Sequence, residues 1–340
     1  MAGAIFLRSP NSRFAINAST HLSVKMTITI NGTLAYTIIK PSTAGVYVLF
    51  EYAELARDYI NITWNGSYSG YSPQTNMVIL TVINFWDAAH ASGSQVGTDA
   101  SVTQYGVNGY SNFLDGANNN NLGISDNNIP NDATMISNYT QDAAGTKTYT
   151  VYAPKDRAVT IPYLNSTGTE TLYSSSGINA TSVTLGNSQL INIVRLGCNK
   201  YDEIPVTFIN KWGAIQREYF ILKSIQKVSA KREQYQKNII SNVGNYSINE
   251  HTKQNFNISA NEEMTVNSDY LPEYYNQVYT ELLLSEQVWI YLKPFSTNTF
   301  TAVPVNITSS DLTYKTSVND RLINFTFTFQ MSYDYINNVR

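Results

Sequence analysis

Apolar and polar residues alternate along several stretches of the chain, which is the pattern of half-buried β-strands. Every second residue from Val24 to Ile30 is apolar, and the residues between them are Lys or Thr. Asn31-Gly32 follows, and the alternation then resumes from Leu34 to Ile38. Because Asn and Gly tolerate the positive φ angles of a two-residue turn, this segment predicts a β-hairpin.

The longest alternation lies near the C-terminus, where every second residue from Ile323 to Tyr335 is apolar. It predicts one strand over Arg321–Tyr335, with Phe325, Phe327 and Phe329 at its centre. A long strand with one fully apolar face must lie against a large core or against a partner subunit. These three phenylalanines are therefore candidate subunit contacts.

Shorter apolar runs predict further strands, at residues 46–50, 60–64, 77–85, 148–152, 158–163, 189–195, 205–210 and 217–223. Two segments have helical spacing instead, at residues 51–59 and 272–284. Pro272 suits the first turn of the second helix. Tyr274 and Tyr275 cluster there with other tyrosines, and we treat both as candidate subunit contacts.

Residues 91–145 have a different character, because Asn, Gly, Ser and Asp dominate them. Such residues favour turns and left-handed backbone conformations. Connections longer than about 15 residues are uncommon in compact domains and often serve in binding. We interpret this segment as an extended arm or insertion that is ordered by contact with something else. Its central run contributes four candidate subunit contacts, Asn118, Asn119, Asn120 and Asn121.

Together these patterns predict a mainly β protein with two antiparallel β-sandwich-like domains. The N-terminal domain is expected over residues 1–90 and the C-terminal domain over residues 146–340. Each domain is expected to hold one short helix, and the long arm of residues 91–145 is expected between them.

Composition narrows the functional classes. The chain has 340 residues, a net charge of −3, 25 tyrosines and only 14% charged residues, where about 25% is usual. A hydrophobic share of 43% excludes disorder, and the slightly negative charge argues against a protein that coats DNA. A surface rich in Tyr, Asn, Ser and Thr offers contact area without burying charge, as in permanent subunit contacts. A carbohydrate-binding lectin would share this profile.

Sequence signatures of catalysis are missing, including phosphate-binding loops, zinc-protease motifs and nucleophile elbows. Asp87 and His90 lie close in sequence, but a loop histidine is the favoured interpretation. The single cysteine, Cys198, follows an apolar strand and is expected to be a buried, inert thiol. The adjacent Glu262 and Glu263 would point to opposite faces of a strand, so they form a poor catalytic pair. We therefore expect no enzymatic activity and no cofactor.

A calcium site remains an alternative for Asp115, Asp126 and Asp132, but turns capped by Asp explain the same residues and we expect no metal. A basic stripe formed by Lys223, Lys227, Lys231, Arg232 and Lys237 has two interpretations. It contacts nucleic acid or an acidic neighbouring subunit, or it protects a solvated edge strand from aggregation. The second interpretation is favoured.

Three segments resemble β-rich virion proteins of tailed bacteriophages, in particular the neck and tail ring proteins of crAss-like phages. They are residues 205–220 (PVTFINKWGAIQREYF), 274–289 (YYNQVYTELLLSEQVW) and 311–327 (DLTYKTSVNDRLINFTF). The resemblance covers mainly residues 200–340. It implies β-sandwich modules that assemble into a symmetric ring around a DNA conduit, with long loops clamping adjacent rings, and it carries over no catalytic residue.

The expected function is therefore a non-enzymatic virion subunit of the tail or of the head–tail connector. Its partners would be further copies of itself in a closed ring and the adjacent tail or portal-side rings, with non-specific proximity to DNA and no membrane. It would be assembled in the cytoplasm of the bacterial host. Two alternatives stay open: a receptor- or glycan-binding adhesin such as a head fibre or tail-tip module, and a depolymerase or peptidase of the tail.

Overall fold

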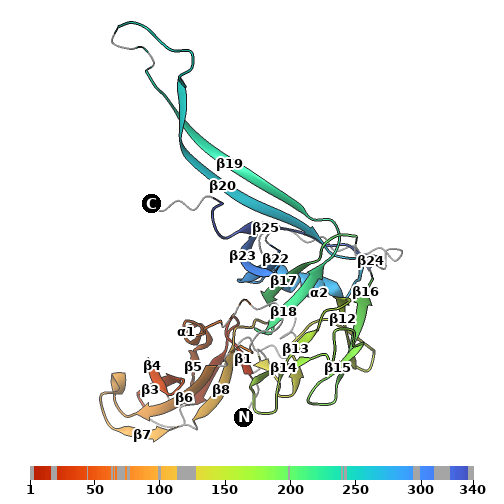
Figure 1. The fold of residues 1–340 in the computed structure, drawn as a ribbon. Coiled ribbons are helices and arrows are strands. Elements are labelled where there is room, and N and C mark those ends of the chain that lie inside the picture. The colour runs from red at the N-terminus through yellow and green to blue at the C-terminus, as the bar shows by residue number, and fades with distance from the viewer. Residues whose placement is uncertain are drawn as a thin grey trace. The chain divides into compact units, whose positions relative to one another are not determined.

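The computed structural model describes residues 4–16, 21–43, 45–62, 64, 66, 73–74, 77–98, 101–112, 128–197, 200–238, 240, 243–293, 299–309 and 322–335 (Figure 1). The chain forms two compact units, neither of which is one continuous stretch. Unit 1 comprises Met1–Cys198, Thr207–Glu218 and Tyr274–Glu286. Unit 2 comprises Asn199–Val206, Tyr219–Glu273 and Gln287–Arg340.

Unit 1 begins with a seven-stranded sheet in the order β4-β3-β6-β8-β1-β9, with β7 paired to β6. Its strands are β1 (Ala4–Phe6), β3 (Ser23–Ile30), β4 (Thr33–Pro41), β6 (Met77–Trp86), β7 (Gln95–Thr98), β8 (Val102–Val107) and β9 (Asn128–Ile129). The predicted hairpin at Asn31-Gly32 is confirmed: it joins β3 to β4, and the two residues have φ angles of 50° and 84°.

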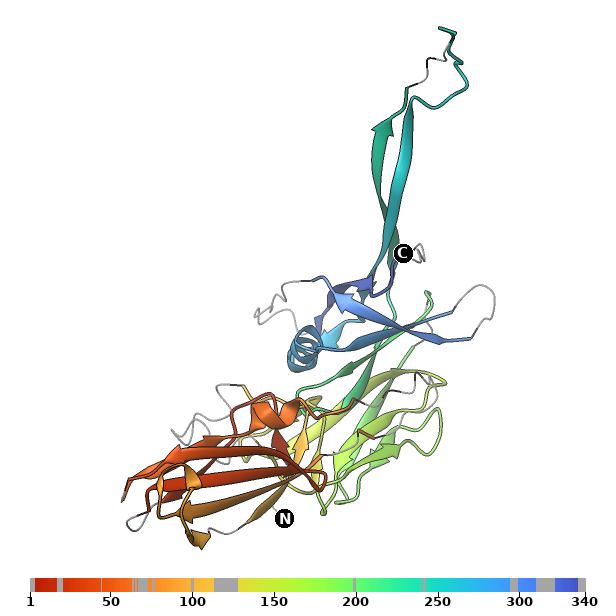
Figure 2. The ribbon, with the colours of Figure 1, turned by 90° about the vertical axis from the view of Figure 1, so that its left-hand side faces the viewer.

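The core of this sheet follows from the alternation in β3. Val24, Met26 and Ile28 are fully buried, whereas the intervening residues are partly exposed. The buried face packs with the short helix α1 (Ala53–Arg57) and with the two-stranded sheet of β2 (Ser12–Ile16) and β5 (Tyr47–Glu51) (Figure 2). Burial of such apolar area contributes about 25 cal/mol per Å².

The rest of unit 1 contains two smaller sheets and a second helix. The three-stranded sheet has the order β10 (Ala133–Thr134), β13 (Thr160–Leu164), β14 (Glu170–Ser174). The four-stranded sheet has the order β11 (Tyr139–Gln141), β12 (Lys147–Pro154), β16 (Leu190–Leu196), β15 (Ser182–Thr184), and β12 and β16 run parallel. The predicted helix at 272–284 is present as α2 (Tyr275–Leu283).

Unit 2 is built on a seven-stranded sheet in the order β18-β17-β22-β23-β25-β20-β19. Its strands are β17 (Ile204–Ile209), β18 (Ile215–Phe220), β19 (Ile225–Gln236), β20 (Lys253–Asn267), β22 (Val288–Leu292), β23 (Thr301–Ile307) and β25 (Thr326–Met331). β17 and β18 each run from one unit into the other. A short pair, β21 (Leu271–Pro272) and β24 (Leu322–Ile323), completes the described strands.

The hairpin of β19 and β20 is longer than the sheet that carries it. β19 pairs with β20 from Ile225 to Gln236, but β25 pairs with β20 only over Glu263–Asn267. Beyond Glu262 the hairpin is therefore a two-stranded ribbon, which Figure 1 shows extending past the other strands of the sheet. None of the strands predicted from apolar runs in the sequence corresponds to this two-stranded ribbon.

The mainly β prediction is confirmed. The predicted domain boundaries differ from the structure, because residues 146–198 belong to unit 1 and both helices lie there. The described part of the expected arm, residues 91–98, 101–112 and 128–145, contains the strands β7 to β11, and β8 lies inside the large sheet of unit 1. Parallel pairing of β1 with β8 and of β12 with β16 also departs from the expected antiparallel arrangement.

Two predicted strands are altered. Residues 60–62 and 64 form no strand. The strand expected over Arg321–Tyr335 is interrupted, because Asn324 Nδ2 donates to the backbone oxygen of Ser268 and the Phe325 N–H donates to Ser268 Oγ, 2.9 Å away. These side-chain bonds replace ladder bonds and separate β24 from β25.

Candidate functional site

The aromatic residues expected at a subunit contact lie mostly inside the core. Tyr275 is fully buried in unit 1, with its ring against Tyr152 at a centroid distance of 5.4 Å. Phe325, Phe327 and Phe329 are buried in unit 2. The chain itself covers these four side chains, so the structure places them in the core, and their role as subunit contacts stays a prediction.

The remaining candidates have different outcomes. Tyr274 is partly exposed at the start of α2, with its ring beside Tyr275. Asn118, Asn119, Asn120 and Asn121 lie outside the described residues, and their proposed contact role stays a prediction.

A buried polar cluster in unit 1 joins α2 to the turn between β17 and β18. The carboxylate of Glu281, which is fully buried, accepts hydrogen bonds from Ser137 Oγ, Gln277 Nε2 and the Lys211 N–H. Each of these donors compensates part of the cost of taking the carboxyl group out of water.

A second buried carboxyl group extends the same cluster. Glu218 Oε1 accepts from Asn138 Nδ2 at 3.1 Å and from Gln216 Nε2 at 2.8 Å. Gln216 Nε2 also donates to Asn138 Oδ1, and Gln216 Oε1 accepts from Asn210 Nδ2 at 2.9 Å. The four side chains are therefore joined by direct hydrogen bonds into one connected network.

The cluster fixes the turn at Asn210–Gly213. Asn210 Oδ1 accepts from the N–H groups of Trp212 and Ala214, at 3.0 and 3.1 Å. Gly213 has a φ of +77°, which glycine adopts without strain. The sequence Asn210-Lys-Trp-Gly213 therefore forms a tight turn between two strands, and side-chain hydrogen bonds hold it.

Burial raises the pKa of Glu218 to about 7 and raises the pKa of Glu281 as well. A carboxyl group that titrates near neutrality is suited to general acid–base catalysis. Both groups are nevertheless covered by donors from their own chain and are at most 2% exposed. A substrate cannot reach them, so the cluster is better explained as a structural network.

Glu170 is a third buried carboxyl group of unit 1. Its Oε2 accepts from the Gln74 N–H at 2.9 Å, and its Oε1 has no hydrogen-bond partner among the described residues. Burial raises the pKa of Glu170 to about 8. The group is therefore protonated at neutral pH, which removes the cost of an isolated buried charge.

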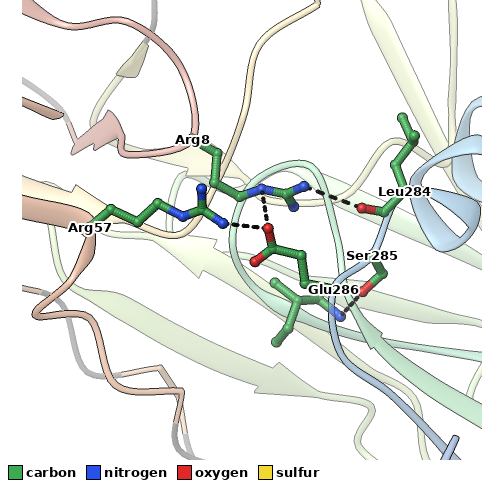
Figure 3. A network of polar contacts seen from close by, with 6 residues as sticks. Arg8, Arg57, Leu284, Ser285 and Glu286 are labelled. Atoms are coloured by element: carbon green, nitrogen blue, oxygen red, sulfur yellow. Dashed lines mark hydrogen bonds and ion pairs between the residues drawn. The ribbon is translucent and has the colours of Figure 1, made fainter. Parts of the chain in front are cut away.

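Two arginines and one glutamate form a network near the end of α2 (Figure 3). Glu286 Oε1 lies 3.4 Å from Arg8 Nε and also pairs with Arg57 Nη2. Arg8 Nη2 donates to the Leu284 oxygen at 3.3 Å. A shallow cleft of about 270 Å³ adjoins the network and is lined by Leu7, Arg8, Ser9, Pro10, Glu51, Glu54 and Arg57. Since both signs of charge line it, the cleft favours neither an anion nor a cation.

Replacing Glu286 by glutamine should lower the free energy of unfolding by about 1 kcal/mol or less, because Glu286 is 42% exposed and solvent screens the pairs. Urea unfolding at low and high salt measures the effect, which should shrink as salt is added. Glu54→Gln, at an exposed position on the same cleft, is the matched control. A loss that does not depend on salt would contradict the ion-pair explanation.

The β19–β20 hairpin is the largest exposed feature of unit 2, since every residue of β19 is exposed. Residues directly opposite each other in an antiparallel pair share a face. One face is polar and includes Lys227, 3.6 Å from Glu263. The other face includes Val228 and Ile258, which are 49% and 38% exposed.

Apolar exposure continues toward the tip of the hairpin. Tyr235 and Phe256 form a ring pair with a centroid distance of 5.9 Å, although both side chains are largely exposed. In the described residues beyond them, four large apolar side chains are 62–87% exposed: Ile240, Val243, Tyr246 and Ile248. Such a concentration of exposed apolar side chains is typical of a surface that a partner covers.

The basic stripe of the sequence lies largely on this hairpin. Lys227, Lys231 and Arg232 are in β19, which is the edge strand of its sheet. Both interpretations of the stripe require an exposed strand, and β19 is one. The edge position was expected under the favoured interpretation, whereas protection of that edge from aggregation stays a prediction. Lys223 precedes β19 and Lys237 follows it.

The other candidates for chemistry serve local structure. Asp87 Oδ1 accepts from the Ser94 N–H at 2.7 Å, and exposed His90 lies in the 3₁₀ turn η1 (Ala89–Ala91). Asp132 Oδ1 accepts from the Tyr163 hydroxyl at 3.1 Å. Glu262 and Glu263 point to opposite faces of β20, as expected from their positions in its pairing with β19. Cys198, Asp115 and Asp126 lie outside the described residues.

Within the described ranges, no group of three or more Cys, His, Asp or Glu side chains is arranged to bind a metal ion. Among the helices of those ranges, none has the length and apolar character required to cross a membrane. No family model, curated protein or solved structure matches the chain.

Proposed function

We propose that the protein is a non-enzymatic structural subunit of a tailed-bacteriophage virion, which assembles into a closed ring around the DNA conduit of the tail or neck. The observation that carries this proposal is the β19–β20 hairpin. An isolated two-stranded ribbon is marginally stable in water, and this one also exposes Val228, Ile258 and Phe256. A neighbouring subunit that covers these side chains would stabilise the hairpin.

The buried carboxyl groups support the same proposal indirectly. Among the described residues, Glu218 and Glu281 form the pair that most resembles catalytic machinery, and their own chain encloses both. The resemblance of residues 205–220, 274–289 and 311–327 to phage virion proteins supports the choice of a virion over other assemblies.

A shortened hairpin tests the proposal. Residues 231–259 are replaced by Asn-Gly, which would join Ala230 to Ala260 because these two residues are directly opposite. We expect the full chain to form large oligomers in light scattering and closed rings in micrographs, and the shortened chain to remain small with an unchanged melting temperature for unit 1. A full chain that stays monomeric over a wide concentration range would contradict the proposal.

The aromatic side chains of the hairpin favour a second candidate function, a glycan-binding adhesin. The side chains of Tyr235, Tyr246 and Phe256 are 45%, 67% and 59% exposed, and an exposed aromatic ring can pack against the C–H groups of a sugar. Selective binding on a glycan array that the shortened chain loses, together with a monomeric full chain, would favour the adhesin over the ring subunit.

A further inference from the structure

We infer that the outer edge of β19 binds β19 of a second copy of this chain, antiparallel and centred on Ala230. The partner is therefore a second copy of the protein, and the contact has two-fold symmetry. This inference goes beyond the ring proposal, since a ring closes through unlike surfaces whereas a two-fold contact joins the same surface of two subunits.

The first observation is that the edge is open. β19 is the last strand in the sheet order, and all twelve of its residues are exposed. The edge of such a strand presents a row of backbone N–H and C=O groups that another strand can pair with. Lys227 and Lys231 do not block this edge, because strand side chains project from the faces of a sheet.

The second observation is that the sequence of β19 is complementary to itself about Ala230. In an antiparallel pair centred there, Lys227 lies opposite Glu233 of the other copy, and this happens twice. Ile225 lies opposite Tyr235, also twice. Opposite charges and an aliphatic–aromatic pair directly across two strands are both stabilising.

The centre of the contact is also compatible with close approach. Ala230 faces itself across the two-fold axis, so no large side chains meet there. Ser229 lies opposite Lys231 and Val228 lies opposite Arg232, so no residue in this register has a like charge directly across from it. Moving the centre to Arg232 would place two arginines opposite each other, which costs stability.

The existing hairpin extends this complementarity to four strands. Lys227 already lies 3.6 Å from Glu263 of its own chain, on the polar face. Glu233 accepts a hydrogen bond from Asn257 on the same face. In the paired ribbon each Lys227 therefore lies between its own Glu263 and the second copy's Glu233, and negative and positive charges alternate across the strands.

A cross-linking experiment tests the register. In the full chain carrying Cys198→Ser, the variant Ala230→Cys should form a disulfide-linked dimer under mild oxidation. The Cα atoms of directly opposed residues are about 4.5–5.5 Å apart, within the range that a disulfide spans. The control Ser229→Cys places its thiols diagonally, about 7–8 Å apart, and should cross-link at least about tenfold more slowly. Equal rates for the two variants would overturn the register.

Charge reversal tests the pairing without a cross-link. Glu233→Lys should weaken the two-fold dimer about tenfold in sedimentation, because Lys227 then faces a lysine at two places. The triple variant Lys227→Glu, Glu233→Lys, Glu263→Lys inverts every charge of the ladder and should restore the dimer. Circular dichroism of each variant excludes unfolding as the cause.

The outcomes also separate this inference from the ring proposal. Rings that form without any Ala230→Cys cross-link would overturn the inference and leave the ring proposal standing. Cross-linked dimers that never form a larger assembly would support the inference and contradict the ring. A chain that is monomeric throughout would contradict both.

Discussion

Raising the pH from about 4.5 to 8 should progressively destabilise unit 1. The pKa of Glu218 is about 7 in the folded chain and that of Glu170 is about 8, against an ordinary value of 4.5. Because the unfolded chain releases both protons at a lower pH, the stability that these groups contribute is complete below pH 4.5 and is lost as pH rises through 7 and 8. One pKa unit corresponds to about 1.4 kcal/mol, so the two groups together account for several kcal/mol.

The free energy of unfolding of unit 1 is measured by denaturant titration at several pH values. Glu218→Gln should reduce the pH dependence, since a neutral amide keeps an acceptor for Asn138 and Gln216 and carries no proton to lose. Glu170→Gln should remove a further part of the pH dependence of the unfolding free energy. Exposed Glu54→Gln is the control and should leave the slope unchanged. A stability that rises between pH 5 and 8 would contradict the assignment of the raised pKa values.

The turn at Gly213 gives the second large expected effect. Gly213→Ala should destabilise unit 1 by more than about 3 kcal/mol, because the added Cβ would lie 2.8 Å from backbone atoms of Asn108 and Gly109. The φ of +77° adds strain for any residue with a side chain. Thermal unfolding of unit 1 measures the loss.

Gly32→Ala is the matched control for this variant. Gly32 has a similar φ of +84°, but no atom lies within 4 Å of the position that its Cβ would take. Its loss should be about 1 kcal/mol, which is the backbone contribution alone. If both variants lose the same free energy of unfolding, the close backbone contact at Gly213 does not contribute to the loss.

Local patterns predicted the elements that depend on local physics. The Asn31-Gly32 turn, the alternation that buries Val24 and Met26, and the apolar stripe that forms α2 each depend on residues close in sequence. These signals are strong because turn conformation and strand periodicity are set by neighbouring residues.

The β19–β20 hairpin could not be predicted from the sequence pattern, for a physical reason. Both faces of β19 are exposed, so no alternation of apolar and polar residues marks it as a strand. The only signal was the basic run of Lys227, Lys231 and Arg232, which is common on edge strands.

The burial of the candidate contact residues in their own chain could not be predicted for a related reason. An apolar face predicts that Phe325, Phe327 and Phe329 are covered, but it does not say whether their own chain or another one covers them. Here their own chain does. The cluster of Glu218 with Glu281 was also missed, because its residues come from segments separated by more than 60 positions and no local pattern brings them together.

The division of unit 1 into three chain segments has a consequence for synthesis of the protein. The segment Tyr274–Glu286 supplies α2 and Glu281, and it is synthesised only after four-fifths of the chain has been made. Until then Ser137 and the Lys211 N–H lack the carboxylate that accepts their hydrogen bonds. Unit 1 therefore cannot complete its fold in the N-to-C order of translation, and a ribosome stalled before residue 274 would hold a chain whose first unit is still open.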